Sequence, residues 1–370
     1  MVTQNERLMS LDAFRGITIA GMILVNNPGN WSHVYPPLLH AKWHGWTPTD
    51  LIFPFFLFII GVAMTFSFPK RLQNPDGNKA LYFKVIKRTL IIFGIGLILS
   101  GFPHYNLSSI RIPGVLQRIA AVYFFASIIT LNTKLRGQAI WMAGLLLFYW
   151  GIMKLVPVPG YGAGDLSVEG NLAAFVDNAL LHGHTWKETW DPEGLLSTIP
   201  AIATTLAGVL TGHLLHAGED KKNIAGWMFV LGWGAIVVGL LWGIGFPINK
   251  SLWTSSYVVF TAGAALQFLG VCYWLIDVKG IKKWAYPGIV YGMNSIAVFV
   301  LSGLVARLTF LIKVSAEDGS SVSLKTWIYN HVFASWAGQL NGSLLFAVTN
   351  ILFWFGLMAI LYRKRIFIKI

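Results

Sequence analysis

The 370-residue chain is strongly apolar, since 55% of its residues are hydrophobic and only 12% are charged. Soluble domains carry roughly a quarter of their residues as charged side chains, so this chain has too few to cover a water-facing surface. Its 16 Trp and 25 Phe residues suit a lipid bilayer, whose interfaces favour tryptophan. The net charge of +13 comes from short clusters between apolar runs, with no nucleic-acid-binding motif, which excludes a nucleic-acid-binding protein.

Ten apolar stretches approach the roughly 20 residues that a membrane-spanning helix needs. We therefore predict an all-α, polytopic integral membrane helix bundle of about ten transmembrane helices, in a single domain over residues 1–370. No basic region precedes the first stretch and no small-residue cleavage site follows it, so we expect a retained helix there rather than a signal peptide. The stretches are 13–27, 50–68, 85–102, 113–131, 138–156, 195–215, 225–246, 255–276, 290–312 and 344–361.

The Lys and Arg residues indicate which ends of these helices face the cytoplasm. Of the 28, 19 fall in the two terminal segments and in every second loop, and loops rich in Lys and Arg are cytoplasmic by the positive-inside rule. Both termini are therefore predicted to be cytoplasmic. The three longest loops, 28–49, 157–194 and 313–343, lie on the opposite side and are rich in aromatic residues. Loops of this length are uncommon without a function, so we expect the working surface to face outward.

A shorter segment, 327–340, has apolar residues at helical spacing but is too short to span a bilayer. We expect it to be an amphipathic helix at the membrane interface.

The first loop and the helix ends beside it concentrate polar side chains, which are costly near hydrocarbon and therefore often functional there. Two structural alternatives stay open. Asp12 and Arg15 can form an interfacial ion pair, and Asp50 can serve the N-terminus of the second helix, which starts at Thr47 with proline in its first turn. The side chains are those of Asp12, Arg15, Asn26, His40, His44 and Asp50.

His40 and His44 have two alternative uses. Their spacing of four residues places both on one face if the segment is helical, an arrangement that metals use. No nearby glutamate or cysteine completes a ligand set, so we expect no metal. A histidine in an outward, aromatic loop suits proton transfer near neutral pH better.

Further polar residues occur in and beside the later spans. They either pair with one another between helices or line a buried cavity for an anionic, hydrogen-bonding ligand. The chain has no P-loop and no Rossmann fingerprint, so helix ends and scattered Arg and Lys residues would have to hold a nucleotide-like molecule. These residues are Arg111, Gln117, Arg118, Asp191, Glu193, Asn249, Lys250, Ser255, Ser256, Asn294 and Ser295.

Seven segments occur in the order found in a known family: SLDAFRG, LVNN, HAKWHGWTPTDLIFPFFLFIIG, RIPGVLQR, DPEGLLSTI, INKSLWTSSYV and YGMNSI. On these motifs the sequence resembles the heparan-alpha-glucosaminide N-acetyltransferase family of transmembrane acetyltransferases over nearly its whole length. It is similar to a shorter form, without the luminal domain and first helix that lysosomal members carry before SLDAFRG. The resemblance therefore implies the acetyl chemistry rather than recognition of a long glycosaminoglycan.

The resemblance implies that acetyl passes from cytoplasmic acetyl-CoA to the amine of a glucosamine-type sugar across the membrane. The family's active histidine falls on His40 and its nearby asparagine on Asn26, and Asp50 joins them as a catalytic candidate. An imidazole can take the proton that an ammonium loses before attacking a thioester, and an amide can donate a hydrogen bond to the thioester oxygen. Transfer through acetyl-histidine and direct transfer both stay open. The candidates for binding acetyl-CoA are Arg15, Gln117, Arg118, Asn249, Lys250 and Ser256.

Two other functions fit the same pattern. One is an O-acetyltransferase that modifies a sugar hydroxyl of an envelope glycan, and the other is a secondary transporter of sugar-like solutes, although we find no related halves. The expected partners are acetyl-CoA, an amino-sugar or glycan acceptor and the lipid bilayer, with no nucleic acid. The oligomeric state, monomer or homodimer, stays open. A bacterial inner membrane is the preferred location because the chain is compact and lacks a luminal domain.

Overall fold

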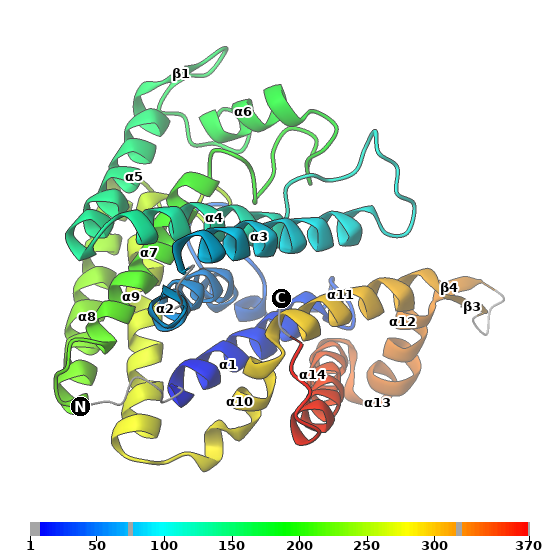
Figure 1. Ribbon diagram of the computed structural model, residues 1–370. Coiled ribbons are helices and arrows are strands. Elements are labelled where there is room, and N and C mark those ends of the chain that lie inside the picture. The colour runs from blue at the N-terminus through cyan, green and yellow to red at the C-terminus, as the bar shows by residue number, and fades with distance from the viewer. Residues whose placement is uncertain (1–7, 73–76, 316–319, 369–370) are drawn as a thin grey trace.

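A computed structural model of the chain describes residues 8–72, 77–315 and 320–368. This part is mostly helical, and its two antiparallel hairpins, β1–β2 and β3–β4, are confined to loops (Figure 1). The longer helices are α1 (Met9–Asn26), α2 (Ile52–Leu72), α3 (Gly77–Gly101), α4 (Val115–Asn132), α5 (Leu135–Leu155), α6 (Leu172–Leu181), α7 (Thr198–Leu215), α8 (Lys221–Gly245), α9 (Ser255–Tyr273), α10 (Tyr286–Met293), α11 (Ser295–Leu311) and α14 (Gln339–Arg363). The short elements are η1 (Pro36–Leu38), η2 (Pro48–Leu51), β1 (Pro157–Val158), β2 (Gly162–Ala163), η3 (Trp274–Val278), η4 (Lys283–Ala285), β3 (Lys313–Ser315), β4 (Ser321–Ser323), α12 (Leu324–Ile328), η5 (Tyr329–Ala334) and α13 (Ser335–Ala337).

All ten predicted stretches are helical, which confirms the all-α polytopic bundle. Among the described residues, eight helices are long and apolar enough to cross a membrane, and the bent pair α10–α11 makes a ninth. The count falls short of ten because α3 carries Lys79, Lys84, Lys87 and Arg88 in its first half, which lowers its apolar character although it is 25 residues long.

The ninth predicted stretch, 290–312, is not one continuous helix. It breaks at Asn294, where α10 and α11 meet at a bend of 72°. The buried Asn294 side chain donates from Nδ2 to the Ile366 carbonyl at 3.1 Å, and its Oδ1 accepts the Ile368 N–H at 2.8 Å. The C-terminal segment therefore occupies the hydrogen-bonding groups at the break. Periodicity of apolar residues does not reveal such a partner because it lies far along the chain.

Close helix contacts occur where glycines face a neighbouring backbone. Gly16 of α1 faces the Gly288 carbonyl of α10, and Gly61 of α2 faces the Thr205 carbonyl of α7. A side chain at either glycine would overlap that backbone, so small residues permit the short interhelical distance, as is common in membrane bundles. The largest apolar cluster fills the space between α1, α2, α4, α7 and α9 and includes Leu57 and Val122.

The connections divide the molecule into two unlike ends. The three long loops carry η1 and η2, then β1, β2 and α6, and finally the β3–β4 hairpin with α12, η5 and α13. In Figure 1, β1, α6, β3 and β4 lie along the upper and right edges, whereas the start of α1 and the connection after α9 lie toward the lower left. The predicted amphipathic segment 327–340 is helical over most of its length, through α12, η5 and α13. Its place at a membrane interface stays a prediction.

Candidate functional site

Asp50 organises the first long loop. As the sequence predicts, a helix starts at Thr47, and the Thr47 N–H donates to Asp50 Oδ2 at 3.0 Å in a capping box. The Ala41 N–H donates to the same oxygen at 3.0 Å, and the Thr47 hydroxyl donates to the Leu39 carbonyl at 2.6 Å. The loop is thereby folded back onto the start of η2. The Asp50 side chain is only 1% exposed.

His40 contacts the other oxygen of the Asp50 carboxylate. Its Nδ1 lies 2.7 Å from Asp50 Oδ1, while 48% of the His40 side chain is exposed. An ionised carboxylate can only accept hydrogen bonds, so the proton sits on Nδ1 and Nε2 becomes the basic nitrogen. Asp50 therefore acts in two ways: one oxygen caps the helix and the other orients the imidazole.

Lys250 completes this group, which we call the histidine cluster (His40, Asp50 and Lys250). Its Nζ lies 3.1 Å from His40 Nδ1, 3.2 Å from His40 Nε2 and 3.9 Å from Asp50 Oδ1. Burial lowers the pKa of the Lys250 ammonium, although the negative charges of Glu193 and Asp50 oppose the shift. The cluster thus places the Lys250 amino group within reach of both imidazole nitrogens and beside one buried carboxylate.

Lys250 is presented by the connection between α8 and α9, and two other predicted residues hold this connection. Asn249 is fully buried, and its Oδ1 accepts the Leu252 N–H at 2.9 Å while its Nδ2 lies 3.3 Å from His44 Nδ1. The Ser256 hydroxyl donates to the Phe246 carbonyl at 2.5 Å. The observed contacts of Asn249 and Ser256 therefore position Lys250.

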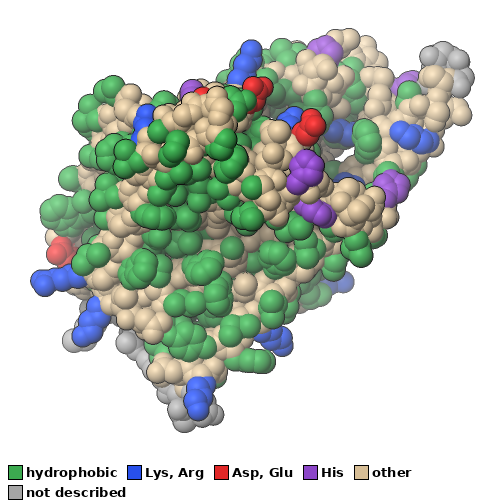
Figure 2. Space-filling view, turned by 90° about the horizontal axis from the view of Figure 1, so that it is seen from above, with side chains coloured by type: hydrophobic (Ala, Val, Ile, Leu, Met, Phe, Trp, Pro, Cys, Tyr) green, Lys and Arg blue, Asp and Glu red, His purple; other side chains and the backbone are tan. Residues whose placement is uncertain are grey.

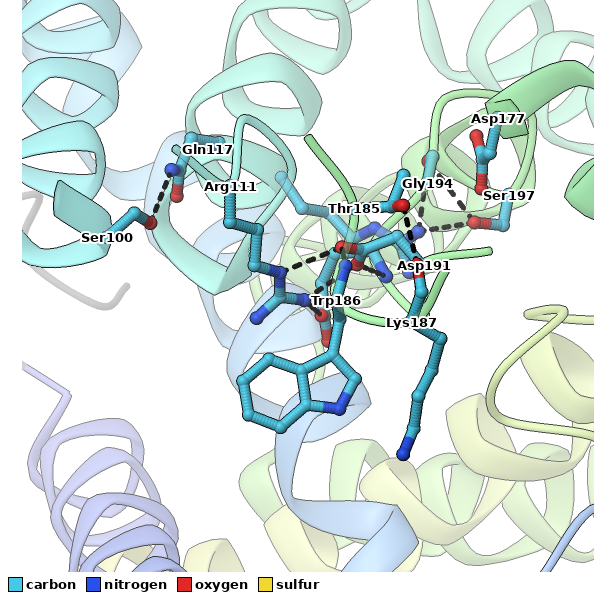
Figure 3. A network of polar contacts seen from close by, with 12 residues as sticks. Ser100, Arg111, Gln117, Asp177, Thr185, Trp186, Lys187, Asp191, Gly194 and Ser197 are labelled. Atoms are coloured by element: carbon cyan, nitrogen blue, oxygen red, sulfur yellow. Dashed lines mark hydrogen bonds and ion pairs between the residues drawn. The ribbon is translucent and has the colours of Figure 1, made fainter. Parts of the chain in front are cut away.

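Arg111 forms a second charged group with two acids from the loop before α7 (Figure 3). Its Nε donates to Asp191 Oδ2 at 2.8 Å, and its Nη2 donates to Asp191 Oδ1 at 2.6 Å and to Glu193 Oε2 at 2.5 Å. Burial lowers the pKa of the Arg111 guanidinium, but the two carboxylates outweigh burial and raise it overall. Bidentate pairing of this kind fixes the geometry of both partners. It ties the loop before α7 to the loop before α4.

Arg118 lies deeper, on α4, and only 2% of it is exposed. Its Nη2 donates to the Gly194 carbonyl at 3.2 Å and to the Ser197 hydroxyl, and the guanidinium lies 5.0 Å from the Trp253 ring centre. Among the described residues, its Nε and Nη1 have no hydrogen-bond partner. Leaving buried donors unpaired is costly, so these two groups are suited to bind an anion.

The structure separates three of the predicted site residues from these groups. Gln117 points toward α3, where its Nε2 donates to Ser100 Oγ at 3.3 Å, so its observed contact is between helices. Arg15 pairs with Asp12 at 3.3 Å, as one alternative from the sequence proposed. It lies about 16 Å from Asn26 along α1, at 1.5 Å per residue.

Asn26 is exposed at the C-terminal end of α1, and no hydrogen bond within the described part of the chain joins it to His40. Gly21, just over one turn earlier, faces Ile52, which places this end of α1 beside the start of α2. The spacing of His40 and His44 would place them on one helix face only if their segment were helical. The segment between η1 and η2 is a loop, so the two histidines do not share a helix face. His40 instead faces Asp50, and His44 faces Asn249.

Sequence reasoning missed Trp253 and its neighbours. Trp253 is fully buried at a positive φ of 52°, its Nε1 donates to Thr204 Oγ1 at 3.1 Å, and its ring lies beside Arg118. Tyr257, also fully buried, donates to the Asp50 carbonyl at 2.5 Å. Both residues lie in the segment SLWTSSYV, where the mixture of aromatic and hydroxyl residues was the available signal. Because tryptophan in an apolar stretch is expected to pack in the core, its contact with a buried cation was not predicted.

These contacts define a class of protein: a polytopic membrane helix bundle with a partly exposed histidine cluster and a buried arginine. In Figure 2, histidines gather on one face of the molecule with acidic and basic side chains among them, beside broad apolar surfaces. His40 and His44 are both exposed.

The family described as "Heparan-alpha-glucosaminide N-acetyltransferase, catalytic" matches residues 7–238. The chain belongs to this family, which confirms the resemblance seen in the motifs. It is 32% identical to the heparan-alpha-glucosaminide N-acetyltransferase of Mus musculus over 361 residues, covering 80% of this chain and 53% of that protein. It is likewise 32% identical to the Homo sapiens protein of the same name over 352 residues, covering 80% and 52%. The chain thus spans about half the length of these curated relatives.

Proposed function

We propose that this chain transfers an acetyl group from acetyl-CoA to the amine of a glucosamine-type sugar. Family membership supports the reaction class, since the relatives are named as N-acetyltransferases of a heparan glucosaminide. The single observation that carries the proposal is the exposed His40 imidazole, held through Nδ1 by the buried Asp50 carboxylate. With Nδ1 engaged by Asp50, Nε2, 3.2 Å from Lys250 Nζ, is the nitrogen proposed to accept a proton, as amine acylation requires.

In the proposed reaction, His40 accepts one proton from the sugar and later releases it. A sugar ammonium first loses a proton to His40 Nε2, and the free amine then attacks the thioester carbon. The new C–N bond forms, the C–S bond breaks, the second proton of the amine goes to the coenzyme A thiolate, and His40 returns its proton to solvent. Asp50 stabilises the imidazolium while it exists. Asn26 is the proposed amide donor to the thioester oxygen as negative charge develops there.

Positive charge for the phosphates of acetyl-CoA is available at Arg118 and Lys250. Arg118 has two donors without partners among the described residues, and Lys250 lies beside the proposed base. Arg111 is less suited because Asp191 and Glu193 already bind it. Cationic groups of this kind offset phosphate charge and form strong hydrogen bonds with it.

The assay that tests the proposal uses detergent-purified protein, labelled acetyl-CoA and paired acceptors. We expect label to enter glucosamine but not N-acetylglucosamine, in a product that resists hydroxylamine because it is an amide. Label in a hydroxylamine-sensitive ester would support O-acetylation instead. Absence of transfer to every acceptor would reject an acetyltransferase and favour a transporter.

We further propose that acetyl-CoA enters from the cytoplasm, where the basic loops lie, and that the sugar binds on the opposite side. Membrane-impermeant thiol labelling of intact cells tests this, because the native Cys272 is buried. Cysteine at the exposed Ser109, in the loop before α4, should label from outside, and cysteine at the exposed Asn223 of α8 should not. The reverse pattern would overturn the proposed orientation.

A further inference from the structure

Lys250 places a primary amine against the imidazole of His40. Its Nζ lies 3.2 Å from His40 Nε2 and 3.9 Å from Asp50 Oδ1, and only 19% of its side chain is exposed. Lysine side chains usually extend into solvent. This one instead holds its amino group at the nitrogen that we propose as the base. The chain itself thus supplies the functional group that an amino sugar would bring to this position.

The backbone that carries Lys250 is fixed by a short hydrogen-bonded turn between α8 and α9. The Asn249 N–H donates to Thr254 Oγ1 at 3.1 Å, and the Thr254 N–H donates to the Asn249 carbonyl at 3.2 Å. The Trp253 N–H donates to the Lys250 carbonyl at 3.1 Å. Because the turn is ordered, the amine is held beside the imidazole without a further loss of backbone entropy, as intramolecular reactions require.

The surroundings of this amine suit a nucleophile. Burial lowers the pKa of the Lys250 ammonium, and the negative charges of Glu193 and Asp50 oppose this shift. The positive charge of Arg118 adds to the lowering. The distance of 3.2 Å to His40 Nε2 allows a proton to pass directly between the two nitrogens. A desolvated lysine beside another cation and a base is a recurring form of activated amine.

Contacts also connect Lys250 to the arginine that we propose to bind acetyl-CoA. The Lys250 carbonyl accepts the Trp253 N–H, and the Trp253 ring centre lies 5.0 Å from the Arg118 guanidinium. Within the described part of the chain, Arg118 has two buried donors without partners. Lys250 therefore lies between the proposed base and the proposed donor-binding arginine in one series of contacts.

We propose that Lys250 Nζ is itself an acetyl acceptor, so that the protein acetylates this lysine when acetyl-CoA is bound and no sugar occupies the site. The inference rests on the proposed acetyltransferase function. The Lys250 ammonium loses one proton to His40 Nε2, and the free amine attacks the thioester carbon. The C–N bond forms, the C–S bond breaks, and the second proton of the amine goes to the coenzyme A thiolate. His40 then releases its proton to solvent.

The product of this step differs from a catalytic intermediate. Nε-Acetyl-lysine is an amide, which is far less reactive than a thioester and does not pass its acetyl group to a sugar. Acetylation also removes the positive charge of Lys250. The modified protein should therefore lose sugar transfer, and the loss should be proportional to the fraction of Lys250 that is acetylated.

The test incubates detergent-purified protein with acetyl-CoA and no sugar, and follows the acetylation of individual lysines by peptide mass spectrometry. We expect Lys250 to react about tenfold or more faster than Lys42, an exposed lysine in the same loop as His40. His40→Ala should slow the reaction of Lys250 by about a hundredfold, the scale for loss of a general base, and leave that of Lys42 unchanged. Lys42→Arg should keep the wild-type rate at Lys250.

Three outcomes would overturn this inference: no acetylation of Lys250, a rate no higher than that of Lys42, or a rate that His40→Ala leaves unchanged. The last outcome would assign the modification to uncatalysed reaction with acetyl-CoA. A parallel assay with glucosamine separates this failure from failure of the proposed function. Sugar transfer by a protein whose Lys250 stays unmodified rejects the inference alone. His40-dependent acetylation of Lys250 without any sugar transfer supports the inference and rejects the amino sugar as acceptor.

Discussion

The histidine cluster and Arg118 place positive and titratable groups in opposite environments. Nearly half of the His40 side chain is exposed, and it depends on one buried carboxylate for its orientation. Arg118 is almost fully buried and contacts a carbonyl, a hydroxyl and an aromatic ring rather than a directly paired acid. The difference indicates a division of work. The first group can exchange protons with solvent, and the second holds a fixed charge inside the bundle.

The largest expected effect is the loss of turnover when His40, the proton-exchanging residue, is removed. His40→Ala should lower turnover about a hundredfold or more, the usual scale for loss of an acid–base group, while thermal stabilisation by acetyl-CoA persists. His44→Ala, in the same loop but facing Asn249, is the matched control and should keep most of the turnover. Steady-state kinetics and melting curves in detergent measure both.

Wild-type turnover by His40→Ala on every amine acceptor would remove His40 from the mechanism. The same preparations also distinguish the two routes of transfer. A covalent acetyl-histidine predicts exchange of labelled coenzyme A into acetyl-CoA without sugar, and direct transfer predicts no exchange. His40→Ala should abolish any exchange that the wild type shows.

The His40–Asp50 region follows closely from its local sequence. The order Thr47-Pro48-Thr49-Asp50 predicted a helix start, and a capping box forms there. That local interaction leaves one oxygen of Asp50 for His40, which is only ten residues away. The apolar stretches likewise predicted the helices, because length and hydrophobicity are local properties of the chain.

The buried region was predicted less completely because its contacts join distant segments. Arg118 was a candidate, but its contacts with Ser197 and Trp253 depend on how α4, α7 and the connection before α9 meet. The break at Asn294 has the same origin, since its partners are at the C-terminal end. A pattern within one segment does not encode which distant backbone group will satisfy an amide or a guanidinium.

Replacing Arg118, the fixed charge, should have a smaller effect, and this effect should be on acetyl-CoA binding. Arg118→Ala should raise the acetyl-CoA concentration needed for half-maximal thermal stabilisation about tenfold, because a cation for phosphate is lost. Arg118→Lys should recover part of this, since it keeps the charge but not the planar set of donors. Arg136→Ala, which removes an exposed arginine from α5, is the control. Equal acetyl-CoA affinity in Arg118→Ala and the control would exclude Arg118 from the binding site.

The smallest expected effect concerns Asp177 of α6, which is buried near Arg118. Burial raises the pKa of Asp177 to about 6, although the Leu195 N–H, 2.9 Å from Oδ1, and the Arg118 charge favour the ionised form. The folded protein therefore binds more protons at this position than the unfolded chain between pH about 4 and about 6. Its stabilising contribution is complete below pH about 4 and is lost as the pH rises through about 6.

Asp177→Asn isolates this contribution because asparagine is neutral at every pH and can still accept the Leu195 N–H. The variant should melt a few degrees above the wild type at pH 8, and the difference should shrink as the pH falls toward 4. The pKa change limits the effect to about 3 kcal/mol, and 1 kcal/mol shifts Tm by only about 2 °C in a chain of this length. Melting curves in detergent between pH 4 and 8 measure it. A pH-independent difference would mean that Asp177 is already ionised and held by Arg118, and the buried region would then contain a compensated charge pair rather than an isolated cation.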